Sequence, residues 1–126
     1  MQRLIVPVAL VIALLLAGCS AKPPVRSDDI EQVLFFSLQR GQKRVASPDE
    51  VRQFMAAYEA ARPIPGDFGT TPPARIEVLF KSGRELVVSG GGESYSTVES
   101  HDPPLNLRGE ELHRLLEQVA AGDVHF

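Results

Sequence analysis

Apolar residues form one continuous run at the N-terminus and short periodic groups after it. The run covers residues 4–16 and follows Arg3, which is the pattern of a secretory signal peptide. The apolar stretch from Leu4 to Gly18 has 15 residues, whereas a helix needs about 20 to cross a bilayer core. The pattern therefore predicts that residues 1–18 direct export and are then removed.

The periodic groups predict one α+β domain over residues 30–126, with elements in the order ββαβββα. Residues 30–39, 43–46, 74–81, 84–89 and 94–99 have the composition and alternation of strands. Ser47-Pro48-Asp49-Glu50 is a strong helix start, and residues 109–121 predict a second helix that ends at Gly122. The apolar stripes of the two helices are Val51, Phe54, Met55 and Tyr58, and Leu112, Leu115, Leu116 and Val119. The economical architecture is one small antiparallel sheet with both helices packed on one face.

The alternation within the strands predicts what each face of the sheet carries. The face under the helices is expected to bear Leu34, Phe36, Leu38, Ile76, Val78, Phe80, Leu86 and Val88. The opposite face would then bear Val33, Phe35, Leu79 and Val87, with no third helix to cover them. Because an apolar patch of a few hundred square ångströms often marks an interface, these four residues are a candidate binding face for an envelope protein or a second copy. The alternative is that the tether or the loop at 63–73 folds over them.

Two segments lack any periodicity. Residues 19–29 contain Pro23-Pro24 and predict an extended tether. Residues 62–73 contain four prolines and two glycines, so we expect a loop that joins neither helix nor sheet, with Phe68 either plugging the core edge or contacting a partner. Residues 37–47 also overlay residues 79–89, which leaves open a duplicated ββα unit or two unrelated hairpins.

Charge narrows the classes of partner. Without residues 1–18 the chain has 108 residues, 12 Lys and Arg against 16 Asp and Glu, and a net charge of −4. This length suits a single domain. A mild acidic excess disfavours nucleic acid and anionic lipid, because both call for clustered basic side chains.

Leu16-Ala17-Gly18-Cys19, at the end of the apolar run, resembles the lipobox of bacterial lipoproteins. The resemblance implies that the Cys19 thiol receives a diacylglyceryl group, that the chain is cut before Cys19, and that the new amine is acylated. It also implies a membrane-anchored envelope protein, and Ser20 in place of aspartate favours the periplasmic side of the outer membrane over the inner membrane. Cys19 is the only cysteine, so an internal disulfide is impossible. The alternative is an ordinary signal peptide followed by a chance cysteine.

Candidate chemistry is sparse. His101, His113 and His125 are not at metal-ligand spacing, and no Gly-x-Ser-x-Gly elbow is present. We therefore expect no catalytic residue, metal site or cofactor, and no enzyme activity.

Residues 89–95, Ser-Gly-Gly-Gly-Glu-Ser-Tyr, resemble the tyrosine-terminated loop of small lipoprotein inhibitors of C-type lysozyme. This chain lacks that family's tryptophan-bearing motif and paired cysteines, and the family is a β-barrel. Two functions follow as expectations. The first is a membrane-tethered binding or structural module, and the second is an inhibitor of an envelope-directed hydrolase that acts through Gly90 to Tyr95.

Overall fold

The computed structural model describes residues 22–66 and 71–122. A 3₁₀ turn, η1, covers Ser27–Asp29. The helices are α2 (Pro48–Ala60) and α3 (Glu110–Ala121). The strands are β1 (Ile30–Ser37), β2 (Gln42–Val45), β3 (Arg62–Ile64), β4 (Ala74–Phe80), β5 (Glu85–Gly90), β6 (Ser96–Val98) and β7 (Leu105–Arg108). None of the helices within the described residues is long and apolar enough to span a membrane.

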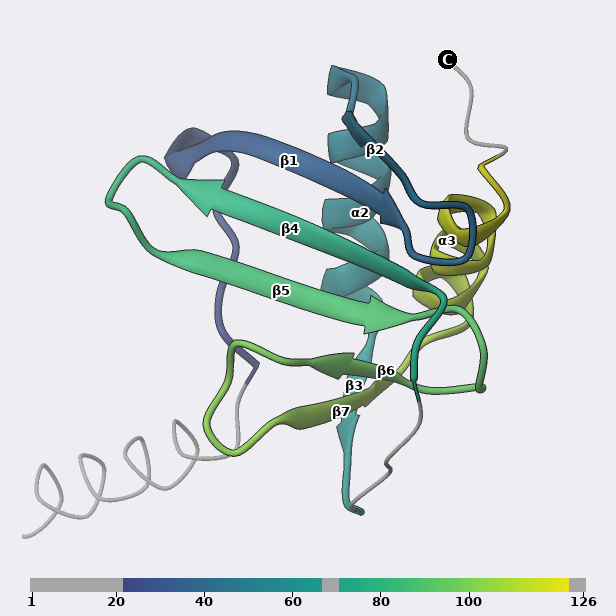
Figure 1. Cartoon of the computed structure of the whole chain (residues 1–126). Helices are drawn as coiled ribbons and strands as arrows, with labels where there is room; N and C mark the ends of the chain where they lie inside the picture. Colours follow the sequence, from purple (N-terminus) through teal and green to yellow (C-terminus); the bar gives the residue numbers. More distant parts are fainter. Residues whose placement is uncertain (1–21, 67–70, 123–126) are drawn as a thin grey trace, which may run out of the picture.

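All seven strands form one antiparallel sheet in the order β2-β1-β4-β5-β6-β7-β3. Both helices lie on one face of it, and β2 and β3 occupy its opposite edges (Figure 1). The α+β class is confirmed. The predicted element order missed β3 and β7. The chain passes directly from the β1–β2 hairpin into α2, whereas it passes from the β4–β5 hairpin through β6 and β7 before it reaches α3.

The prediction that residues 62–73 join no ladder is wrong at its start, because Arg62–Ile64 pair with β7. Pro63 lies opposite Leu107 in this pair. A proline is tolerated there because β3 is an edge strand, so the missing N–H can face away from the sheet. Phe68 lies outside the described residues.

The predicted facing of β1 is also wrong. Val33 and Phe35 are 1 % and 3 % exposed and belong to the core. They pair with Val78 and Ile76 of β4, and cross-strand partners share a face. The pairing with β4 therefore assigns the opposite parity of β1, including Leu34 and Phe36, to the outer face. The core beneath the helices comprises Val33, Phe35, Ile76, Val78, Phe80, Leu86 and Val88 from the central strands, and Phe54, Tyr58, Leu112, Leu115 and Leu116 from the helices.

The outer face is a mixture of half-buried apolar and charged side chains. Lys43 and Arg75 place their cations 5.3 and 5.1 Å from the Phe36 ring centroid, which is cation–π geometry. Arg75 also lies 3.3 Å from the Glu77 carboxylate. Burial raises the pKa of Glu77, with a further contribution from Glu85, while Arg75 opposes it. Leu79 and Val87 lie on this face, half-buried.

The start of α2 is confirmed as a capping box. The Ser47 side chain accepts a hydrogen bond from the Glu50 backbone N–H, and the Glu50 carboxylate accepts one from the Ser47 N–H. Pro48 stands at the first helical position, where its missing N–H costs nothing. The α3 helix ends at Gly122 with φ +73°, as its glycine predicts.

Candidate functional site

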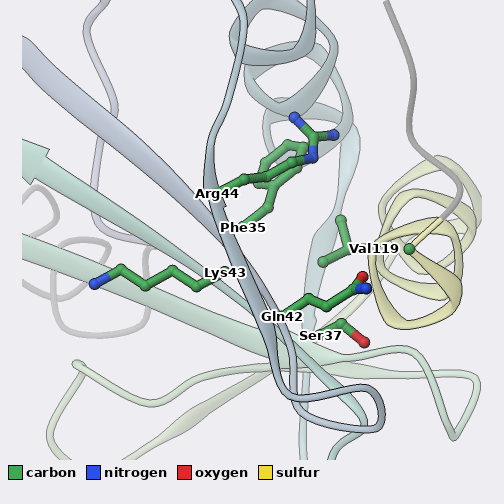
Figure 2. Close-up of a pocket in the computed structure, with 7 residues that line it drawn as sticks. Phe35, Ser37, Gln42, Lys43, Arg44 and Val119 are labelled. Atoms are coloured by element: carbon green, nitrogen blue, oxygen red, sulfur yellow. The ribbon is translucent and has the colours of Figure 1, made fainter.

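A pocket of about 360 Å³ lies on the helical side of the sheet, beside its β2 edge. Its lining comes from β1, β2 and the C-terminal end of α3, namely Phe35, Ser37, Gln42, Lys43, Arg44, Val119 and Gly122. Figure 2 shows Gln42 and Ser37 directed toward α3, whereas the Lys43 side chain points away from it. Lys43 therefore lines the pocket near its backbone, consistent with its ammonium lying over Phe36 on the other face.

Close contact between α3 and the β1–β2 hairpin forms one end of the pocket. The Ser37 hydroxyl donates to the Ala120 carbonyl at 2.6 Å and accepts from the Arg40 N–H at 3.1 Å. A Cβ on Gly122 would lie 2.8 Å from Gln42 Oε1, which is the mobile end of a side chain that can shift. Glycine is therefore favoured at this C-cap for its positive φ. Gly41 has φ +64°, which permits the tight turn before β2.

Arg44, which also lines the pocket, is paired with Glu50 at the start of α2. The Arg44 guanidinium donates to both carboxylate oxygens of Glu50, at 2.6 Å to Oε1. It also lies 5.3 Å from the Phe35 ring centroid. Glu50 is 1 % exposed, whereas the Arg44 side chain is 43 % exposed. Burial alone would raise the pKa of Glu50, but the hydrogen bonds from Arg44 and Ser47 outweigh it and the pKa lies below its usual value. The ion pair is therefore present at neutral pH, when both groups are charged.

The pocket combines an apolar floor with a few polar groups. Phe35 and Val119 supply the apolar surface, and Gln42 supplies an amide at the mouth. The Ser37 hydroxyl is hydrogen-bonded to two backbone groups, as donor to one and acceptor from the other. It therefore lacks the hydrogen bond to a general base that would activate a serine as a nucleophile. An aromatic floor with polar groups around it suits binding of a side chain or a small ligand.

Neither His101 nor His113, the two histidines that the structure describes, lines this pocket. His101 Nδ1 lies 2.7 Å from the Pro103 carbonyl, and His113 Nε2 lies 3.2 Å from Glu117. His125 and Cys19 lie outside the described residues. Across residues 22–66 and 71–122, no group of three His, Cys, Asp or Glu side chains could hold a metal ion.

Gly90 and Gly91 have a packing role. A Cβ on Gly90 would meet Leu116 Cδ1 at 3.0 Å, and one on Gly91 would meet the Leu116 carbonyl oxygen at 2.9 Å. Gly91 also has φ +95°. This loop therefore lies against α3, and its exposed part is reduced to residues 92–94. The depression beside it, which Tyr95 lines, holds only about 70 Å³. An inhibitor function through Gly90 to Tyr95 stays a prediction from the sequence.

The proposed binding face of Val33, Phe35, Leu79 and Val87 is not one surface. The structure places the first two in the core and the other two on the outer face. Phe35 instead forms the floor of the pocket. The sequence did not predict this pocket, because its lining comes from residues 35–44 and residues 119–122. These two segments are far apart in the sequence, so the pattern within either one does not indicate that they are in contact.

Comparisons of the chain with protein-family models, with curated proteins and with solved structures found no match.

Proposed function

We propose that this chain is an envelope lipoprotein, anchored through Cys19 on the periplasmic side of the outer membrane, whose domain binds an extended segment of a partner protein. Binding rather than catalysis is its role. The lipobox residues Leu16 to Cys19 support the anchoring. The observation that carries the binding proposal is the pocket beside β2, which is an edge strand of the sheet that the described residues form.

The β2 edge supplies backbone groups for such a segment. An edge strand has unpaired N–H and C=O groups, and an extended peptide can add to it as a further strand. The pocket then takes one apolar side chain of the peptide over Phe35 and Val119. Such pairing gives affinity through the main chain and specificity through the pocket.

Charge indicates the kind of segment. Arg40 and Lys43 lie between Leu38 and Ala46, and no acidic residue lies in this segment. The third cation there, Arg44, is already paired with Glu50. All four residues of β2 are exposed. An acidic segment would complement this hairpin, and complementary charge raises the association rate and suppresses wrong partners.

The anchoring is tested with Cys19→Ser in the full chain. We expect the variant to accumulate as uncleaved precursor without acyl label, because the residue that is lipidated before cleavage is gone. Metabolic labelling with a clickable fatty acid, followed by mass spectrometry of the N-terminus, measures both. Ser20→Ala is the control and should be labelled and cut normally. Processing of Cys19→Ser before residue 19 would contradict the anchoring.

The binding site is tested with photo-crosslinking amino acids at two glutamine positions, Gln42 and Gln53. Gln42 points toward the pocket (Figure 2), whereas Gln53 is exposed on α2 and does not line the pocket. We expect a discrete adduct from position 42 in native envelopes and none from position 53. The crosslinked segment, made as a peptide, should bind at least tenfold more weakly to Gln42→Trp and within twofold of normal to Gln53→Trp. Equal adducts or equal affinities would contradict the proposal.

A further inference from the structure

The segment before β1 is bound to the domain, whereas its composition predicts a free tether. Lys22 Nζ donates to three carbonyls at the end of α2, those of Tyr58 (2.6 Å), Glu59 (2.9 Å) and Ala61 (2.7 Å). An ammonium has three N–H donors, so all of them are used. A cation is also favoured at a helix C-terminus, and α2 has no basic residue of its own in its last turn.

Three further contacts hold the same segment. The Tyr58 hydroxyl donates to the Pro23 carbonyl at 2.6 Å, Arg84 donates to the Pro24 carbonyl at 2.8 Å, and the Lys81 N–H donates to the Asp29 carbonyl at 2.8 Å. Burial raises the pKa of Tyr58 to about 12, against the opposing effect of Arg84. The phenol is therefore protonated, and able to donate, throughout the neutral range.

This attachment limits how far the domain can stand from a lipid on Cys19. Only three residue steps separate Cys19 from Lys22, and three fully extended residues span roughly 10 Å. Lys22 is fixed at the C-terminal end of α2, directly before edge strand β3. Whatever lies at that edge of the sheet is therefore brought to the membrane surface.

Two arginines lie at that edge. Arg62 follows the Ala61 carbonyl that Lys22 binds, and it is directly opposite Arg108 in the β3–β7 pair. Both are exposed. Neither has an acidic side chain within ion-pair distance among the described residues. Like charges directly opposite in a sheet are destabilising, and an anionic surface would relieve that repulsion.

We propose that the β3 edge, through Arg62 and Arg108, lies on anionic phospholipid headgroups and sets the orientation of the domain. The inference rests on the proposed anchoring at Cys19. The overall charge of the chain disfavours anionic lipid, but the fold brings two basic residues together at the one edge next to the anchor. Six strand spacings separate β3 from β2 in the sheet (Figure 1), which is up to about 29 Å at roughly 4.8 Å each. The β2 pocket is thus presented away from the bilayer, where a partner can reach it.

The test uses the chain from Cys19 to Phe126, whose single cysteine can be coupled to one C14 chain through a maleimide. The core residues that the structure describes lie between Val25 and Ala120, and residues 1–18 are those that the proposed processing removes. One such chain binds membranes reversibly, which leaves the contribution of the protein measurable. Partitioning is measured by co-sedimentation with vesicles of phosphatidylcholine, with and without 30 % phosphatidylglycerol, a composition that we choose at about the level of natural anionic leaflets.

We expect Arg62→Gln/Arg108→Gln to lose about thirtyfold in partitioning to the anionic vesicles, because each basic side chain near such a surface contributes about fivefold. The matched control is Arg40→Gln/Arg52→Gln, which removes the same charge elsewhere and should change partitioning less than threefold. Equal losses in the two double variants, or equal binding of the parent to both kinds of vesicle, would overturn the inference.

Orientation is read separately by NMR in nanodiscs that carry a gadolinium-chelating lipid. The amide signals of Arg62 and Arg108 should broaden more than those of Gln42 and Lys43, and the reverse order would overturn the proposed orientation. Because the lipid is coupled chemically, these results do not depend on processing in cells. If the coupled chain partitions as expected but the native chain carries no acyl label in cells, the anchoring is contradicted and the lipid-binding edge is not. If the native chain is labelled but Arg62→Gln/Arg108→Gln partitions like the parent, the lipid-binding edge is contradicted and the anchoring is not.

Discussion

At the scale of single residues, Glu50 links two elements through its hydrogen bonds. Its carboxylate accepts from the Ser47 N–H as part of the cap of α2 and from Arg44 at the end of the pocket. A carboxylate that is 1 % exposed is tolerated only when it is paired and hydrogen-bonded. Glu50 therefore joins β2 to α2 and fixes the guanidinium beside Phe35.

We predict that Glu50→Gln lowers the free energy of unfolding by about 2 kcal/mol at pH 7. Breaking a fully buried pair costs more than this, but Arg44 is partly exposed and can be hydrated. The pKa of Glu50 is lowered in the folded state, so its stabilisation is present above pH 4.5 and is lost as the pH falls through the folded pKa. Urea unfolding at several pH values measures both effects. Glu31→Gln, at an exposed position of β1, is the control and should change the free energy of unfolding little. If the Glu50 variant and the parent lost the same free energy of unfolding as the pH falls, the role assigned to Glu50 would be contradicted.

At the scale of elements, the sequence alone assigned the facing of β1 wrongly. Both parities of this strand carry bulky apolar side chains, so alternation does not select one. The register Val33 to Val78 and Phe35 to Ile76 selects it, because a shift of one residue would exchange the two faces. This choice also fixes Phe35 as the floor of the pocket.

We predict that Phe35→Ser lowers the free energy of unfolding by more than 3 kcal/mol, since it removes a buried aromatic ring from the core. Leu79→Ser, on the half-buried outer face, should cost about 1 kcal/mol. Chemical denaturation of the two variants in the chain from residue 19 measures the difference. Equal costs would mean that the two side chains share a face.

The glycine-rich segment after β5 gives a second test of an element. We predict that Gly91→Ala costs at least 2 kcal/mol, because its Cβ would lie 2.9 Å from a backbone oxygen of α3 and its φ is +95°. Gly92→Ala is the matched control and should cost less than 1 kcal/mol, because its Cβ meets only the Pro73 ring at 3.3 Å. Thermal unfolding measures both, and two neutral substitutions would show that this segment is a free loop.

At the scale of the whole molecule, the hydrogen bonds between residues 22–29 and the domain determine how the domain is positioned relative to the proposed anchor at Cys19. We predict that Lys22→Met releases this segment, because three carbonyls at the end of α2 lose their donor. Trypsin should then cut after Arg26 at least tenfold faster, with a loss of about 1 kcal/mol in stability. Lys81→Met is the control, because Lys81 binds the segment through its backbone N–H and its replacement leaves that bond in place. Equal cleavage rates would contradict the attachment.

The sequence by itself determined the signals that act over a few residues. The capping box at Ser47 and Glu50 places the start of α2, and Gly122 places the end of α3. The turn glycines Gly41 and Gly83 mark the two hairpins, both at positive φ. The lipobox likewise depends on adjacent residues, and Cys19 anchoring therefore stays a prediction from sequence. These features need no knowledge of the rest of the chain, because each cap or turn is satisfied by its own neighbours.

Only the tertiary structure decided the facing of β1, the presence of β3 and β7, and the contacts of Lys22. Neither β3 nor β7 shows an alternation in its three or four residues that marks it as a strand. β3 forms by pairing with β7, and β7 also pairs with β6. The Lys22 contacts span 36 to 39 residues, and the pocket joins β1 and β2 to the end of α3. The physical reason is common to all of them. Each depends on which distant groups the fold brings within hydrogen-bond or packing distance, and a local pattern of apolar and polar residues does not record that choice.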